Sequence, residues 1–153
     1  MSETRSHHFV QTLPYSHEEV FTALITPSHI RRWWNAQQVI VIPKIGGIWV
    51  ATWGNDFDHP EFISFSRIKD LVVGKRLVLG DYQYVSPDGG LAFEADFETT
   101  FEILSNPERG VDLTVDQTGF PSDPIADEYY ENCQQGWQDT LSSLERFLRM
   151  QAL

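Results

Sequence analysis

Apolar and polar side chains alternate along the middle of the chain, from residue 39 to residue 118. In FEADFETTFEIL, residues 93–104, apolar or small side chains occupy every second position, and mainly acidic side chains lie between them. Turn sequences such as IGG, VGK and PDGG separate runs of this kind. A period of two predicts antiparallel strands with one buried face and one solvated face. We expect strands near residues 9–13, 39–42, 47–53, 62–71, 76–84, 93–104 and 111–118.

Helical spacing appears on both sides of this region. Ser16 and Glu19 form a capping box that begins one short helix, and Thr26 followed by Pro27 begins a second. Near the C-terminus, Asp123 begins a long helix with a single apolar stripe. The stripe consists of Ile125, Tyr129, Cys133, Trp137, Leu141, Leu144 and Leu148. At 1.5 Å per residue it is roughly 40 Å long, so it needs a long apolar surface to cover.

The inner face of the predicted sheet is the apolar surface of that length, and this defines the fold class. We expect an α+β protein in one domain over residues 1–153. Six or seven antiparallel strands form a curved sheet wrapped around the C-terminal helix, and two short helices follow the first strand. Gly136 lies inside the long helix, where glycine costs about 1 kcal/mol relative to alanine. We expect it either to let neighbouring backbone approach or to leave space beside the indole of Trp137.

Net charge excludes some classes of partner. The 153 residues include 22 acidic and 11 basic side chains, giving a net charge of −11. Such a chain repels nucleic acid and anionic membranes, so we expect neither as a partner. Cys133 is the single cysteine, the N-terminal sequence is unlike a secretory signal, and no apolar run has the length of a membrane span. We therefore expect a cytoplasmic protein.

Aromatic side chains on the predicted inner face are the candidates for a ligand-binding cavity. Ligand pockets are mostly apolar with a few polar groups, and the hydroxyls of Tyr82, Tyr84 and Tyr129 would supply those groups. An aromatic stripe on a buried face is also typical of packed core, and this stays the alternative for each candidate. The candidates are Trp49, Trp53, Phe65, Tyr82, Tyr84, Phe97, Phe101, Tyr129, Cys133 and Trp137.

The sequence predicts no catalytic residue, metal site or cofactor. It contains no phosphate loop, dinucleotide fingerprint or nucleophile motif. His7 and His8 are interpreted as an exposed pair, and Cys133 as a buried, inert thiol. The loop GNDFDHPEF has a spacing that matches no metal motif and is typical of an exposed acidic loop. Its possible ligands are Asp56, Asp58, His59 and Glu61.

Several motifs together resemble the helix-grip superfamily called SRPBCC or START-like (Bet v 1-like). Within it, the chain is most similar to the branch named after the activator of the heat-shock-protein-90 ATPase. The motifs lie at residues 20–24, 27–34, 46–47, 118–120 and 136–137, and the likeness spans nearly the whole chain. The resemblance implies a curved antiparallel sheet that grips the C-terminal helix, with an apolar cavity between them. It implies no catalytic residue.

We interpret the chain as a non-catalytic protein that binds a small apolar ligand in this cavity, as a monomer or a homodimer. Members of the superfamily bind lipids, hormones or polyketides, or assist chaperones, and the fold alone does not choose among these functions. Two alternatives stay open. One is a co-chaperone-like module that docks on a chaperone or another protein through its acidic outer face. The other is a polyketide cyclase- or dehydratase-like enzyme with a tyrosine or an acidic residue as proton carrier.

Overall fold

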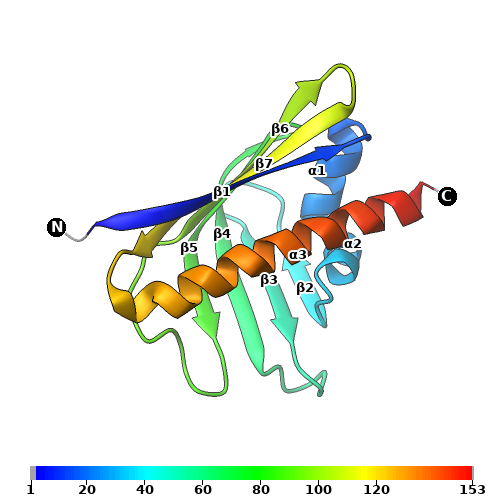
Figure 1. Ribbon diagram of the computed structural model, residues 1–153. Coiled ribbons are helices and arrows are strands. Elements are labelled where there is room, and N and C mark those ends of the chain that lie inside the picture. Colours follow the sequence, from blue (N-terminus) through cyan, green and yellow to red (C-terminus); the bar gives the residue numbers. More distant parts are fainter. Residues whose placement is uncertain (1–2, 153) are drawn as a thin grey trace.

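A computed structural model describes residues 3–152 and shows a curved antiparallel sheet with one long helix lying along its concave side (Figure 1). The strands lie in the order β1-β7-β6-β5-β4-β3-β2. Their bounds are β1 Thr4–Leu13, β2 Gln38–Val41, β3 Ile48–Trp53, β4 Phe62–Val72, β5 Arg76–Val85, β6 Glu98–Asn106 and β7 Gly110–Pro121. The helices are α1 His17–Ile25, α2 Pro27–Trp33, the short 3-10 helix η1 Pro124–Ala126, and α3 Asp127–Gln151. The predicted α+β helix-grip fold is confirmed.

The helices begin at or near the predicted caps. Ser16 Oγ accepts a hydrogen bond of 3.1 Å from the N–H of Glu19, and this bond caps α1. Pro27 occupies the first position of α2. Asp123 caps η1, which precedes α3, through a 3.0 Å bond from the N–H of Ile125. The extra turn places Ile125 at the surface, where it is 56% exposed, so its predicted place in the buried stripe is wrong.

Two tryptophan side chains fasten α1 to the rest of the fold. Nε1 of Trp33, at the end of α2, donates to the carbonyl oxygen of Ala23 over 2.8 Å. Nε1 of Trp49, on β3, donates to the carbonyl oxygen of Leu24 over 2.9 Å. Both carbonyls lie in the last turn of α1, where a helix leaves its carbonyl groups unpaired. The two indoles therefore satisfy the end of α1 and fix α2 and β3 against it.

The long helix α3 is held at both ends. Its C-terminal half buries Leu141, Leu144, Phe147 and Leu148 and packs on α1 and α2. Its N-terminal end lies against β1, where the ring of His7 stacks on Tyr130 with centroids 3.9 Å apart. Nε2 of His7 also lies 2.8 Å from the carbonyl oxygen of Tyr130. His7 is only 6% exposed, so the interpretation of it as an exposed residue is wrong: β1 begins earlier than predicted and meets α3 there.

Residues 93–97 form an irregular segment before β6, so the predicted strand over residues 93–104 begins five residues too early. Gly119 lets this segment come close to β7, because its φ is +94° and a Cβ there would collide with the carbonyl oxygen of Asp96. The backbone of the segment thus lies directly against β7 at Gly119. This places Phe97, 2% exposed, against Phe120 at a centroid distance of 4.8 Å.

A β-bulge in β5 changes which residues face inward. Asp81 has a φ of +50°, and together with Tyr82 it lies opposite the single residue Ser66 of β4. Leu79 faces the core before the bulge. The extra residue shifts the inward and outward alternation of β5 by one position. Tyr82 and Tyr84, which follow the bulge, therefore face the same side as Leu79.

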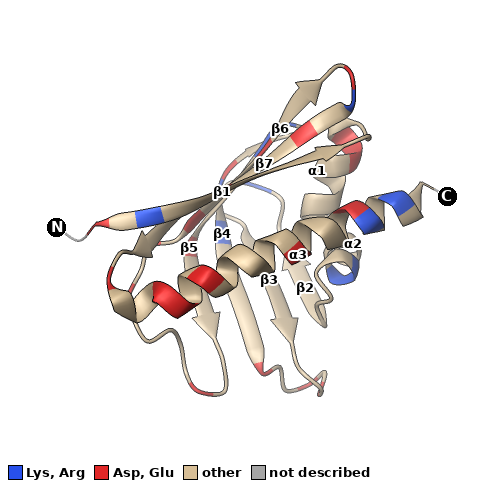
Figure 2. Ribbon diagram, viewed as in Figure 1, with Lys and Arg blue, Asp and Glu red and all other residues tan. Residues whose placement is uncertain are grey.

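The charged side chains at the ends of α2 and α3 have the signs that stabilise a helix (Figure 2). Asp127 and Glu128 lie in the first turn of α3 and Arg149 in its last turn, the distribution that the helix dipole favours. The last turn of α2 contains Arg31 and Arg32. Within residues 3–152, no helix combines the length and apolar character needed to cross a bilayer.

Candidate functional site

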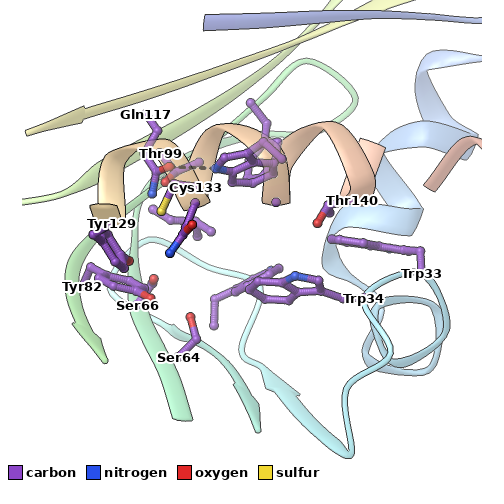
Figure 3. Close-up of a pocket in the computed structure, with 16 residues that line it drawn as sticks. Trp33, Trp34, Ser64, Ser66, Tyr82, Thr99, Gln117, Tyr129, Cys133 and Thr140 are labelled. Atoms are coloured by element: carbon purple, nitrogen blue, oxygen red, sulfur yellow. Dashed lines mark hydrogen bonds between the residues drawn. The ribbon is translucent and has the colours of Figure 1, made fainter. Parts of the chain in front are cut away.

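A cavity of about 270 Å³ lies between the middle of α3 and the inner face of the sheet (Figure 3). The strands β3 to β7, the C-terminal end of α2 and one side of α3 all contribute lining residues. Every lining side chain is uncharged or a weak acid of the tyrosine or cysteine type. The cavity therefore has no fixed charge of either sign.

Tryptophan side chains form one end of the cavity. Trp33 and Trp34, at the end of α2, lie on the side opposite Tyr82 and Tyr129 (Figure 3). The ring of Trp34 lies 5.4 Å from that of Trp49. Trp53 supports Trp34 from behind, with an edge-to-face contact at 4.8 Å and a 3.3 Å hydrogen bond from its Nε1 to the carbonyl oxygen of Trp34.

Two tyrosines form the other end. Tyr82 enters from β5 just after the bulge, and Tyr129 enters from the first turn of α3 (Figure 3). Phe97 lies behind both of them, with its ring centroid 5.8 Å from Tyr82 and 5.7 Å from Tyr129. The thiol of Cys133 lies close to Tyr129 and the hydroxyl of Ser64 lies close to Tyr82. This end therefore concentrates hydroxyl and thiol groups.

These groups are all protonated at neutral pH. Burial raises the pKa of Tyr129 well above its usual value, and the neighbouring Tyr82 and Cys133 raise it further. Burial likewise raises the pKa of Tyr82 and that of the Cys133 thiol, with hydrogen bonding from neighbouring groups opposing it in part. In this state each hydroxyl is a hydrogen-bond donor as well as an acceptor.

Trp137 and Gln117 define the middle of the cavity. Nε1 of Trp137 donates to Oε1 of Gln117 over 2.7 Å, shown as a dashed line in Figure 3. Phe101 packs against the indole with ring centroids 5.7 Å apart. Gln117 is 7% exposed, so the bond satisfies a buried acceptor and fixes the indole as a wall of the cavity.

The cavity opens along one side of α3. Asn132, Gly136 and Thr140 all line it, and their four-residue spacing puts them on one face of the helix. Asn132 and Gly136 are also exposed to solvent, so they border the opening. Apart from its chain neighbours and its own helix backbone, a Cβ at Gly136 would meet no atom within 4 Å. Close approach of another backbone segment therefore does not explain this glycine.

Six of the ten side chains proposed from the sequence line this cavity: Trp49, Tyr82, Phe101, Tyr129, Cys133 and Trp137. Trp53 and Phe97 lie behind its walls. Tyr84 faces the same side as Tyr82 but is not part of the lining. Phe65 lies on the opposite face of β4, where the guanidinium of Arg67 is 5.5 Å from its ring centroid.

Sequence reasoning missed the polar lining of the strands and the two tryptophans at the C-terminal end of α2. Ser64 and Ser66, each 5% exposed, face inward in place of Phe65. The parity of β4 could have shown this, because Arg67 alternates with the buried Ile68. Gln117 likewise continues the alternation of Val111, Leu113 and Val115 on β7. The other missed lining residues are Trp33, Trp34, Leu79, Thr99, Asn132, Gly136 and Thr140.

The acidic loop before β4 lies away from this cavity. His59 Nδ1 is 2.8 Å from Asp56 Oδ2, and both side chains are exposed. Across residues 3–152, no three or more His, Cys, Asp or Glu side chains form a group that could hold a metal ion.

Comparison with other proteins places the fold among known structures. The chain is similar to a protein from Mesorhizobium loti, with a TM-score of 0.76, 21% identity and coverage of 95% of this chain and 98% of that one. An Hsp90 activator from Plasmodium falciparum has a TM-score of 0.70 and 18% identity, with coverage of 94% and 95%. DynU16, from the dynemicin biosynthetic locus, has a TM-score of 0.72 and 16% identity, and the match covers 94% of this chain and 47% of that one.

A search of curated proteins gives no match to the sequence. The sequence pattern of one family, described as Activator of Hsp90 ATPase homolog 1-like protein, matches residues 14–149. This match covers most of the chain, including α1, α2, all strands but β1, and nearly all of α3. The chain therefore belongs to the Activator of Hsp90 ATPase homolog 1-like family.

Proposed function

We propose that the protein binds a small, uncharged and largely apolar molecule in the cavity between α3 and the sheet. The observation that carries this proposal is a cavity of about 270 Å³ with aromatic walls and no charged lining residue. An apolar cavity of about 150 Å³ accommodates benzene, so this one offers room for roughly two rings. An ionised ligand would lose its hydration without gaining a partner of opposite charge.

The same cavity supports binding better than proton transfer. A general acid or base works best when its pKa lies near the operating pH. Burial moves the pKa of Tyr82 and of Tyr129 upward, away from neutrality. These hydroxyls therefore suit hydrogen bonding to a ligand, and a cyclase-like role for them has less support.

A fluorescence titration tests the proposal. Adding 2-ethylnaphthalene, an uncharged two-ring compound, to the purified protein should change tryptophan emission and reach saturation, because Trp34, Trp49 and Trp137 line the cavity. Gly136→Phe should abolish the change by filling the opening. Gln138→Phe is the matched control, since it adds the same ring at an exposed position of the same helix that is not part of the lining. No saturable change in the wild type, with no ligand mass in native mass spectra of freshly purified protein, would contradict the proposal.

Docking on a chaperone is a second candidate, which the family membership and the similar fold of the Plasmodium falciparum Hsp90 activator favour. The exposed Glu128 and Glu131, on the acidic N-terminal half of α3, would face the partner (Figure 2). Purified Hsp90 should then hydrolyse ATP faster when the protein is added, and less so at high salt or with Glu128→Gln/Glu131→Gln, because exposed charges are screened. An unchanged ATPase rate would remove this candidate.

A further inference from the structure

Polar groups are distributed unevenly in the cavity. Tyr82, Tyr129 and Cys133 gather at one end, and Trp33 and Trp34 close the other (Figure 3). A ligand that fills the cavity therefore meets the tyrosine hydroxyls and the thiol at one end, and the aromatic faces of the tryptophans with the hydroxyl of Thr140 at the other.

The polar end brings several hydroxyl and thiol donors together. Ser64, Tyr82, Tyr129 and Cys133 form a row in which each member lies beside the next. Each of the four groups brings one proton. One hydrogen bond between each pair of neighbours would use three of the four protons and leave one to donate to a ligand. Burial keeps the tyrosines and the thiol protonated, as described above, so this surplus persists across the physiological pH range.

The amide of Gln117 adds to the surplus. Its Oε1 accepts a hydrogen bond from Nε1 of Trp137. The two N–H groups of its Nε2 therefore remain as further donors on the same buried side chain. The cavity thus offers donors, while no lining side chain carries a charge that could pair with an ion. A neutral oxygen acceptor is the complement of this arrangement, because a carboxylate would bring a charge that nothing here neutralises.

We propose that the preferred ligand is an uncharged molecule with a carbonyl-type oxygen, bound with that oxygen beside Tyr82 and Tyr129 and its apolar body between Trp34 and Trp137. This inference rests on the proposed function, since it assigns an orientation and a chemical class to the ligand of the same cavity. Tyr82 and Tyr129 are then the residues that determine specificity.

Matched probes separate this inference from the proposed function. 2-Acetylnaphthalene and 2-ethylnaphthalene have nearly the same shape, but only the first has a carbonyl oxygen, and 2-naphthoate has a negative charge. Wild-type protein should bind the ketone roughly 2- to 10-fold more tightly than the hydrocarbon, which is the contribution of one net hydrogen bond. The carboxylate should bind most weakly at pH 7.5.

The variants Tyr82→Phe and Tyr129→Phe carry the decisive comparison. At least one of them should reduce the preference for the ketone to about one, because the substitution removes the hydroxyl that donates to the carbonyl oxygen. Tyr84→Phe is the matched control and should keep the preference, because Tyr84 is on the same strand and face but outside the cavity lining. Circular dichroism of each variant establishes that it is folded.

Three outcomes would overturn the inference. Equal binding of ketone and hydrocarbon by the wild type overturns the assigned chemistry and leaves the proposed function standing. A ketone preference that survives in both tyrosine variants overturns the assigned orientation. Binding of none of the three compounds overturns the proposed function together with this inference.

Discussion

Trp137 on α3 and Gln117 on β7 meet in a side-chain hydrogen bond of 2.7 Å, the indole N–H donating to the amide oxygen. Twenty residues separate the two in sequence, and the bond joins the middle of the long helix to β7, the strand next to the β1 edge of the sheet. It is the point at which the helix is tied to the sheet beside the cavity.

Removing the acceptor should destabilise the fold. Gln117→Leu leaves the indole N–H of Trp137 without its partner, so we expect the free energy of unfolding to fall by about 1–2 kcal/mol. Urea unfolding measures it. Gln135→Leu serves as the control, because Gln135 bonds only to the exposed Asp139 and should change stability by less than about 0.5 kcal/mol. Equal effects of the two substitutions would show that the Trp137 bond contributes nothing.

Two glycines should respond in opposite ways to alanine. Gly136→Ala should raise the free energy of unfolding by about 0.5–1 kcal/mol, because alanine favours the helix and the new methyl meets no atom of another segment within 4 Å. Gly119→Ala should lower it by about 2 kcal/mol or more, since the φ of +94° disfavours a side chain and the methyl would collide with Asp96. Thermal unfolding of both variants checks the prediction. A stabilised Gly119→Ala would contradict the close approach of Asp96 to Gly119.

Stability should be lost at alkaline pH. The folded state raises the pKa of Cys133, Tyr82 and Tyr129, so it binds more protons than the unfolded state once the unfolded groups ionise. Their stabilising contribution is complete below the unfolded values of 9.0 for cysteine and 10.0 for tyrosine, and it declines as the pH rises beyond them. Above pH 10, Tyr129 should remove up to about 1.4 kcal/mol per pH unit, and Tyr82 should add to this loss.

Urea unfolding at pH 7, 9 and 10.5 measures this loss. The double variant Tyr82→Phe/Tyr129→Phe should be less sensitive to alkaline pH than the wild type, because phenylalanine has no proton to lose. A pH profile identical to that of the wild type would mean that other groups cause the alkaline loss.

Cys133 should react slowly with iodoacetamide. The thiolate is the reactive form, and the raised pKa of the buried thiol reduces its fraction at pH 7.5. We expect alkylation at least about 10-fold slower than in the urea-unfolded protein, by mass spectrometry, and slower still with saturating 2-acetylnaphthalene, because Cys133 lines the cavity. Equal rates in folded and unfolded protein would contradict the burial of the thiol.

Elements with regular alternation were predictable from the sequence. On β7, Val111, Leu113 and Val115 alternate with polar residues, and the structure buries all three. The capping box at Ser16 begins α1 where predicted. Local patterns suffice in these places because the periodicity of side chains and the preference for burial lead to the same answer.

The cavity lining was harder to predict, because local hydrophobicity and strand parity disagree there. Phe65 is more apolar than Ser64 and Ser66, yet the pairing of β4 with Trp49 and Ala51 of β3 turns the serines inward. The alternation of Arg67 with Ile68 carries the parity of this strand, but a ranking of positions by hydrophobicity overrides it at Phe65. A polar patch within an otherwise apolar wall is therefore missed when each position is ranked by hydrophobicity alone.

The left-handed conformation of Asp81 makes the chemistry of the binding end depend on one bulge. If β5 paired with β4 through this position without the bulge, simple alternation from Leu79 would turn Asp81 and Gln83 inward in place of Tyr82 and Tyr84. Relatives with the same number of residues here but no bulge would thus recognise different molecules through the same scaffold.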